Sequence, residues 1–388
     1  MAFVWSPRLL RLAHCILCAS LPVLAGCGAG AGTGDKPPPP TPSVTTDTAS
    51  ASAPLPTTTT VAAATTEPAP PPPPEPLRAR FLSVGDVIFG RRIAKVLART
   101  GDPEFPFRPM AALYREVDFT FANLENPFTT AKKPNETPPG KRYAVLWARP
   151  EHAETLAKYK FNAVNLANNH AMDQDLRGVK ETLKALDKAG VQHVGVGLDL
   201  ESAWTPMLVD VRGLKIAFIG ASFASKNDMG ITRNDYVARI EDEKRLRAAC
   251  KKAREEAAFV VVTFHAGDEH KFAPNDAQKK FAKAAVQAGA DIVIGGHPHV
   301  VQPAEKIDGK WVFYSIGNYI FDQAAVDNSE AIAVELVVKL PEGATHAEIE
   351  RLRVHPVVIA EGAPTPADDT RAAKILGRVG VPSRDLVP

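Results

Sequence analysis

The chain has 388 residues, of which 45% are hydrophobic and 23% are charged. These fractions are ordinary for a globular protein and exclude a wholly disordered chain, a collagen and a coiled coil. Lysine and arginine number 46 against 44 aspartates and glutamates, a formal charge of +2. Because nucleic-acid binding needs a concentrated cationic face, we expect no nucleic-acid partner.

The first 26 residues predict a secretion signal. Arg8 and Arg11 precede a mostly apolar run at 12–25 that is too short and too polar to be a good bilayer span. Residues 24–27 (LAGC) resemble the lipobox of bacterial lipoproteins. This resemblance implies cleavage before Cys27 and lipidation of its thiol, which would anchor the protein to the membrane of the cell envelope. Gly28, which is not aspartate, favours the outer membrane; ordinary secretion with a chance cysteine is the alternative.

Residues 27–77 predict a disordered tether between that anchor and a folded domain. The stretch is rich in proline, threonine, alanine and glycine and has few larger aliphatic side chains. It cannot bury enough apolar surface to offset the entropy lost on ordering. After cleavage and lipidation, Cys250 is the one free thiol, which excludes an internal disulfide and a cysteine-based zinc site. We expect Cys250 to be a half-buried helix residue.

Residues 78–388 predict one α/β domain, because short β-branched runs alternate with amphipathic segments. We expect strands at 79–84, 118–122, 163–166, 193–195, 215–219, 259–264, 291–294, 311–315, 331–339 and 350–359. We expect helices near 90–99, 150–159, 174–189, 238–256 and 276–288. The three successive strands within 311–359 predict a mixed sheet, or two stacked sheets, covered by helices.

Carboxylates, amides and histidines follow five of the predicted strands. They lie at 85–86 (GD), 123–126 (NLEN), 168–170 (NNH), 265–269 (HAGDE) and 295–299 (GGHPH). Loops beyond the carboxyl ends of strands build the ligand crevice of α/β sheets. Each short motif alone is also typical of a turn, a helix cap or a structural histidine. Together, oxygen and imidazole groups without a thiolate favour zinc, manganese or iron.

The ordered set of motifs resembles the CapA-type (poly-γ-glutamate capsule synthesis) proteins, a branch of the calcineurin-like metallophosphoesterases. The matching stretches are SVGDVIFGR (83–91), NLEN (123–126), NLANNHAMD (165–173), HAGDEH (265–270), IVIGGHPHVVQP (292–303) and YSIGNYIFDQ (314–323). The resemblance implies a four-layer αββα sandwich and a place in capsule or exopolymer biosynthesis. It also implies an anionic polymer or phosphoester as substrate, with capsule synthase or export components as possible partners.

The same resemblance implies one or two divalent ions (Mn, Fe or Zn). Asp86 and His299 would bind the first ion and Glu125 would bridge the two, as carboxylates do in such pairs. The second ion would be bound by Asn169, His265 and His297. Ile88 stands where phosphoesterases have a further histidine, Glu125 replaces their bridging aspartate, and Ala266 replaces an aromatic residue common in the CapA-like pattern. The missing imidazole predicts a weaker first site.

Catalytic and substrate-binding roles are implied for six further residues. His170 would be the general acid, since its ordinary pKa of about 6.5 suits proton transfer near neutral pH. Asp173 would orient His170 or cap the helix that begins near 174. Arg91 would hold an anionic substrate, or would be a solvent-facing helix residue. The residues that would line the substrate cleft are Glu269, Asn318 and Asp322; a structural turn also explains the last two.

Three functions are compatible with these patterns. The first is a metal-dependent hydrolase at the cell surface that acts on phosphoesters or on an amide-linked anionic polymer. The second is a non-catalytic accessory that binds or guides a nascent capsular polymer during export. The third is a lipid-anchored scaffold, which leaves the ordered histidine, aspartate and asparagine set unexplained. The first two differ in whether His170 is needed for polymer output.

Overall fold

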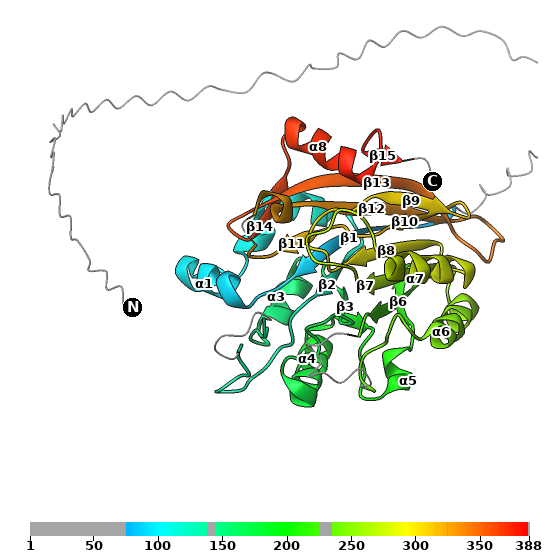
Figure 1. Cartoon of the computed structure of the whole chain (residues 1–388). Helices are drawn as coiled ribbons and strands as arrows, with labels where there is room; N and C mark the ends of the chain where they lie inside the picture. The colour runs from blue at the N-terminus through cyan, green and yellow to red at the C-terminus, as the bar shows by residue number, and fades with distance from the viewer. Residues whose placement is uncertain (1–74, 138–143, 225–234, 324, 387–388) are drawn as a thin grey trace, which may run out of the picture. The chain divides into compact units, whose positions relative to one another are not determined.

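The computed structural model describes residues 75–137, 144–224, 235–323 and 325–386 (Figure 1). The predicted signal at 1–26, the lipidated Cys27 and nearly all of the predicted tether lie outside the described residues. No helix within the described ranges combines the length and apolar character needed to cross a membrane.

The first sheet is mixed and carries most of the strands. Its order is β14 (Ala363–Pro366), β13 (Glu348–Ala360), β12 (Glu330–Leu340), β1 (Leu77–Val87), β2 (Phe119–Leu124), β3 (Ala163–Asn165) and β4 (Gln192–Val194). Strand β11 (Asn318–Ile320) also pairs with β1, and β15 (Asp385–Leu386) pairs with β13. Strands β1 to β4 are parallel, so their carboxyl ends meet at one edge.

The second sheet has a parallel centre with antiparallel edges. Its order is β5 (Met207–Val211), β6 (Leu214–Ser222), β7 (Phe259–His265), β8 (Ile292–Gly296), β10 (Lys310–Phe313) and β9 (Ala304–Ile307). Strands β6, β7, β8 and β10 run parallel to one another. Parallel central strands are buried on both faces, which explains their nearly continuous runs of valine, isoleucine and phenylalanine.

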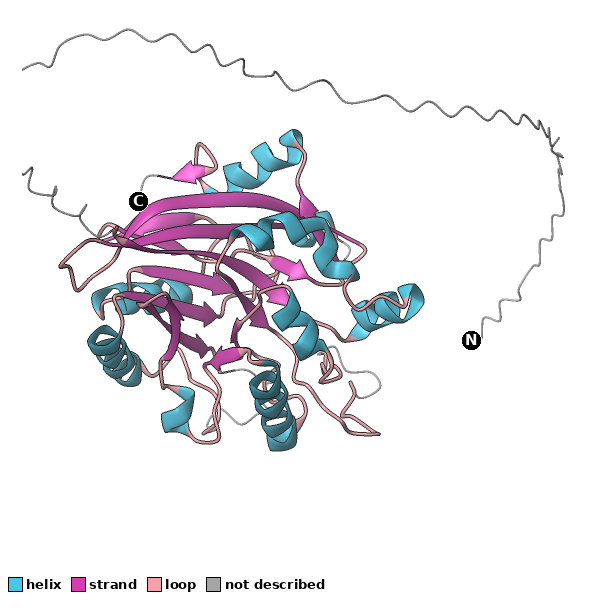
Figure 2. Cartoon of the chain, turned by 180° about the vertical axis from the view of Figure 1, so that it is seen from behind, coloured by secondary structure: helices cyan, strands magenta, loops and turns pink. Residues whose placement is uncertain are grey.

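The two sheets stack, and helices cover both outer faces (Figure 2). Along β1, Phe81 lies in the core between the sheets and Leu82 in the core under the helices, as strand alternation requires. The ring of Phe218 from β6 lies 5.9 Å from that of Phe81 and 4.5 Å from that of Phe121. The fold is therefore the four-layer αββα sandwich predicted from the sequence.

The helices divide between the two outer faces. Helices α1 (Arg91–Thr100), α2 (Ala111–Glu116), α3 (His152–Lys158) and α4 (Asp175–Ala189), with the 3-10 helix η1 (Phe105–Met110), cover the first sheet. Helices α5 (Leu200–Ala203), α6 (Glu243–Glu256) and α7 (Asp276–Gln287) cover the second. The 3-10 helix η2 (Val326–Ser329) precedes β12, and α8 (Asp369–Val379) packs against β12 and β13.

Every strand and helix expected from the sequence is present, with ends displaced by a few residues. The helix expected from 238 begins at Glu243, because the Asp242 side chain accepts a hydrogen bond from the backbone N–H of Arg245 and caps it. The expectation for Cys250 is wrong: its side chain is fully buried against the second sheet, and burial raises its pKa to about 12.

A close backbone approach fixes the strand that carries Asp86. A Cβ atom on Gly85 would lie 1.9 Å from the carbonyl oxygen of Gly317, which is backbone and cannot swing away. The backbone N–H of Asp86 donates to that same oxygen, and Asp86 pairs in register with Asn318 on β11. Glycine at position 85 therefore lets β11 lie against the end of β1 that carries Asp86.

Candidate metal centre

The sheets bring the predicted metal ligands together at one edge of the sandwich. Asp86 lies near the end of β1, and Glu125 follows β2 directly. From the other sheet, His265 is the last residue of β7, and His297 and His299 follow β8. All five are at least 96% buried. The convergence follows from the parallel strands, whose carboxyl ends lie together in each sheet.

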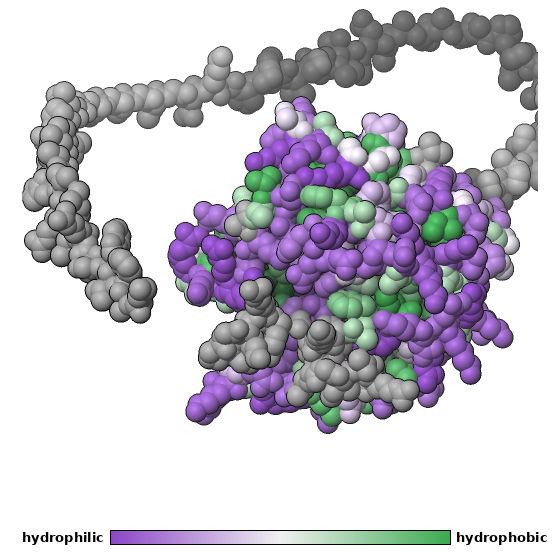
Figure 3. Space-filling view, in the orientation of Figure 1, coloured by the Kyte–Doolittle hydropathy of each residue, from purple (hydrophilic) through white to green (hydrophobic). Residues whose placement is uncertain are grey.

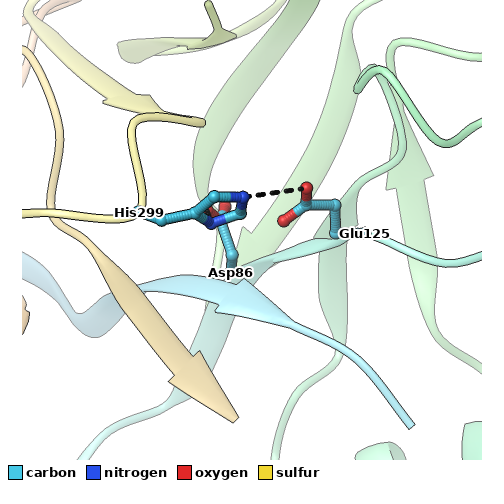
Figure 4. Close-up of side chains that lie close together, drawn as sticks. All are labelled: Asp86, Glu125 and His299. Atoms are coloured by element: carbon cyan, nitrogen blue, oxygen red, sulfur yellow. Dashed lines mark ion pairs between the residues drawn. The ribbon is translucent and has the colours of Figure 1, made fainter. Parts of the chain in front are cut away.

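Asp86, Glu125 and His299 form the tightest group (Figure 4). Each offers one ligand atom, and the three atoms lie within 4.8 Å of one another. Nδ1 of His299 is 3.4 Å from Oδ2 of Asp86, and its Nε2 is 3.8 Å from Oε1 of Glu125. Two carboxylates and an imidazole are a donor set that suits zinc, manganese or iron.

Three of the four carboxylate oxygens in this group lack a hydrogen-bond donor among the described residues. Within the described part of the chain, neither Oδ2 of Asp86 nor either carboxylate oxygen of Glu125 accepts a hydrogen bond. Burying such oxygens without a partner is costly in free energy. A divalent cation among them would supply the missing partner, so the residues present fit a metal ion.

The two histidines after β8 have opposite electrostatic environments. Burial lowers the pKa of His299, but the carboxylates of Glu125 and Asp86 outweigh it and raise the pKa to about 9. Burial, together with the neighbouring His265 and His299, holds the pKa of His297 well below its ordinary value. A neutral His297 keeps a nitrogen lone pair for a metal.

The backbone at both histidines is strained. The φ angle is +100° at His297 and +56° at His299, and positive φ at such residues is found where the surrounding structure fixes a functional side chain.

Asn169 contacts His265, which in turn contacts His297, and these are the three residues predicted for a second ion. Nε2 of His265 lies 2.8 Å from Oδ1 of Asn169 and 3.2 Å from Nδ1 of His297. The same nitrogen is 3.6 Å from Oε1 of Glu125. Glu125 therefore lies close to members of both predicted ligand groups, as does Asp86, whose Oδ1 is 3.7 Å from Nδ1 of His265.

His170 borders this centre with Asp173 behind it. Nε2 of His170 is 3.9 Å from Oε1 of Glu125, and its Nδ1 is 2.6 Å from Oδ2 of Asp173. Burial lowers the pKa of His170, but Asp173 outweighs it and the net shift is upward. Asp173 also accepts a hydrogen bond from the backbone of Leu146, while Gln174 occupies the N-cap position of α4. Asp173 therefore contacts His170 and does not cap the helix.

The three residues predicted to line a substrate cleft lie at different distances from the candidate metal centre. Oδ1 of Asn318 is 2.8 Å from Nδ1 of His299, so Asn318 holds that ring. Asp322 does not contact the metal-ligand group; Oδ1 of Asp322 is 2.9 Å from a guanidinium nitrogen of Arg91, and the backbone N–H of Arg92 donates to its Oδ2. Glu269 is exposed, and the contact described for it is an ion pair with His270 at 3.8 Å.

Residues 80–323 match the family described as "Bacterial capsule synthesis protein PGA_cap". The chain belongs to this family. It is 32% identical over 284 residues to "PGA biosynthesis protein CapA" of Bacillus subtilis, covering 73% of this chain and 72% of that one. It is 31% identical over 291 residues to "Capsule biosynthesis protein CapA" of Bacillus anthracis, covering 73% and 68%. The solved calcineurin-like phosphoesterase YfkN of Bacillus subtilis gives a TM-score of 0.47 at 12% identity, covering 79% of this chain and 97% of that one.

Sequence reasoning missed Asn123, one of the residues that link the two sheets at this centre. Asn123 donates from Nδ2 to Oδ1 of Asp86 at 2.8 Å, and the same nitrogen lies 3.1 Å from Nδ1 of His265. Asn165 in turn donates to Oδ1 of Asn123. The signal was present, since Asn123 opens the quoted NLEN motif. Ile88, by contrast, is fully buried in the core under the helices and offers no ligand.

Proposed function

We propose that this protein is a metal-dependent hydrolase of capsule or exopolymer biosynthesis, held at the extracytoplasmic face of the cell envelope by a lipid on Cys27. The observation that carries the hydrolase proposal is the buried Asp86, Glu125 and His299 group, in which three of the four carboxylate oxygens accept no hydrogen bond from the described residues. Membership of a capsule synthesis family supports the biological setting. The substrate class is a phosphoester or an amide-linked anionic polymer.

The residues of the candidate metal centre have different proposed roles, which follow from their positions. Asp86, Glu125 and His299 would hold a divalent ion, and Asn169, His265 and His297 would hold a second, with manganese, iron and zinc as the candidates. Such an ion supplies Lewis-acid activation of the bond under attack. His170, on the border of the centre and hydrogen-bonded to Asp173, would give its proton to the leaving group. Asn318 keeps the His299 ring in place.

The metal proposal is tested by elemental analysis of the full-length protein, purified without a chelator or a histidine tag. We expect one or two equivalents of manganese, iron or zinc, and a loss of at least one equivalent in Glu125→Gln. Arg247→Gln, on the exposed face of α6, is the matched control and should retain the metal of the wild type. A folded wild-type protein that stays free of metal after incubation with these ions would overturn the hydrolase proposal.

A non-catalytic accessory that binds or guides a capsular polymer is the second candidate. The exposed position of Glu269 and the pairing of Arg91 with Asp322 favour it, because both leave fewer free groups to hold a substrate at the metal centre. His170→Ala separates the two functions when it is expressed in cells that make the polymer. The hydrolase requires polymer processing or output to change, whereas the accessory requires both to stay as in the wild type.

The lipid anchor has its own test. Cys27→Ser removes the thiol that the signal would lipidate and leaves the rest of the chain unchanged. We expect wild-type protein in the membrane fraction and the variant in the soluble extracytoplasmic fraction, because acyl chains contribute about 0.8 kcal/mol per buried methylene. Equal membrane association of the two proteins would contradict lipidation at Cys27. A Cys250→Ser control should partition as the wild type does.

A further inference from the structure

We propose that a cationic cavity next to the metal centre binds carboxylate groups of an anionic polymer while the centre acts on it. This inference rests on the proposed function, because it names the class of polymer on which the proposed hydrolase would act. The cavity has a volume of about 480 Å³ and is distinct from the Asp86, Glu125 and His299 group. We call it the arginine cavity after Arg92, Arg99 and Arg371, which line it.

Helix α1 forms one wall of the arginine cavity. Arg92, Ile93, Val96 and Arg99 line it, at spacings that place them on one stripe of the helix. The buried Ile93 anchors this stripe against Gly362, where a Cβ atom would meet Cδ1 of Ile93 at 2.3 Å. Figure 3 shows hydrophilic residues gathered over α1 at the left of the molecule. The packing of Ile93 therefore fixes the helix that carries Arg92 and Arg99 along the wall of the cavity.

The opposite walls come from segments far along the chain. Phe321 to Gln323 form the side toward the metal centre, and Val326 and Ser329 of η2 lie beyond them. Arg371, in the first turn of α8, closes the cavity from the C-terminal region. Helix α1, the segment from Phe321 to η2, and helix α8 thus each contribute arginine or apolar side chains to the arginine cavity.

Two of the three arginines have free guanidinium groups. Neither Arg92 nor Arg371 makes a side-chain hydrogen bond or ion pair to another residue of the described chain. The two acids that line the cavity are already paired, Asp322 with Arg91 and Glu361 with Arg99. The Arg99 and Glu361 pair is about two-thirds exposed on both sides and therefore contributes little, so Arg99 can exchange partners. The cavity consequently has unbalanced positive charge.

The arginine cavity shares a wall with the metal centre. The ring of Phe321, which lines the cavity, lies 4.8 Å from the ring of His299. Gln323, also a lining residue, accepts a hydrogen bond from Asn318, and Asn318 contacts His299. A chain bound in the cavity would therefore lie one layer of side chains from the proposed metal ions.

The lining selects carboxylates on short aliphatic stems. Arginine binds carboxylate and phosphate alike, through two parallel hydrogen bonds. The apolar walls of Ile93, Val96 and Ile359 suit methylene groups, which a bare inorganic anion does not have. A polymer with a carboxylate on each repeat could engage several arginines at once, so we expect it to bind more tightly than single anions.

The test is isothermal titration of a short γ-linked glutamate oligomer into the full-length protein, with the neutral amide form of the oligomer and inorganic phosphate as comparison ligands. We expect the acidic oligomer to bind most tightly, with an affinity that falls as salt rises. Arg92→Gln and Arg371→Gln should each weaken binding by about fivefold. Val326→Glu, at an exposed position on the cavity rim, should also weaken it, and Arg247→Gln should not.

Repeating the titration with Glu125→Gln separates the cavity from the metal centre. Oligomer binding that persists in Glu125→Gln and is weakened about fivefold in Arg92→Gln supports the arginine cavity, even if elemental analysis finds no metal. Unchanged oligomer binding in both Arg92→Gln and Arg371→Gln would overturn it, whatever the metal content. Phosphate binding tighter than oligomer binding, or equal binding of the neutral oligomer, would overturn it as well.

Discussion

Nδ1 of His170 lies 2.6 Å from Oδ2 of Asp173, within a buried turn that immediately precedes helix α4. The second ring nitrogen of His170 faces Glu125 at 3.9 Å. The imidazole is therefore held on one side by a carboxylate and presented on the other side to the candidate metal centre. Asp173 acts through His170 and is a positioning residue.

Asp173→Asn should lower the pKa of His170. Burial alone depresses the pKa of this histidine, and Asp173 is the partner that reverses the shift. A titration of His170 by NMR in the metal-free protein checks the direction. If His170 is the general acid, the alkaline limb of the pH–rate profile should move to lower pH in the variant. Asp187→Asn, at an exposed aspartate beside His193, is the control and should leave His170 unmoved.

Glu125→Gln should lower the stability that the protein gains from metal. In metal-free protein the substitution also removes a carboxylate that faces His299 at 3.8 Å and raises the pKa of that buried imidazole, so the melting temperature should fall. With added manganese or zinc, the wild type should gain about 2.7 kcal/mol at a hundredfold excess over Kd, and the variant much less. Thermal melts of both proteins with chelator and with metal make the comparison. Equal metal-induced shifts in the two proteins would contradict a ligand role for Glu125.

Gly85→Ala should destabilise the fold and disturb the metal centre together. The added methyl group would collide with the backbone at Gly317, next to the register pair of Asp86 and Asn318. We expect a loss of about 3 kcal/mol in the free energy of unfolding, together with reduced metal content. Gly377→Ala is the same chemical change on exposed helix α8, with no atom within 4 Å, and should stabilise by about 0.5–1 kcal/mol. Denaturant unfolding measures both, and a neutral Gly85→Ala would show that β11 can move away.

Much of the centre could be predicted from the sequence because its ligands follow strands. The runs before Asp86, His265 and His297 are strongly apolar, and parallel pairing brings their ends together. The contact of Asn123 with His265 was not predictable, since it depends on how one sheet faces the other. The pairing of Arg91 with Asp322 joins segments far apart in the sequence and depends on β11, which has three residues and no periodicity to detect.

Stability should fall on acidification through the range in which Glu335 titrates. This side chain is 1% exposed, and its oxygens lie 2.7–2.8 Å from donors of Arg80, Arg351 and His355. Burial raises its pKa, but His355 and Arg80 outweigh burial and lower the pKa from 4.5 to about 2. A lowered pKa means that the contribution is complete above pH 4.5 and is lost as the pH falls toward 2.

The loss should be at most about 3–4 kcal/mol, because lowering the pKa from 4.5 to about 2 corresponds to roughly 1.4 kcal/mol for each pH unit. Denaturant unfolding at a series of pH values measures it, and Glu335→Gln should flatten the slope between pH 4.5 and 2. Glu350→Gln is the matched control, because Glu350 lies on β13 of the same sheet but pairs with Arg78 at the surface. A slope as steep in Glu335→Gln as in the wild type would show that other carboxylates govern acid unfolding.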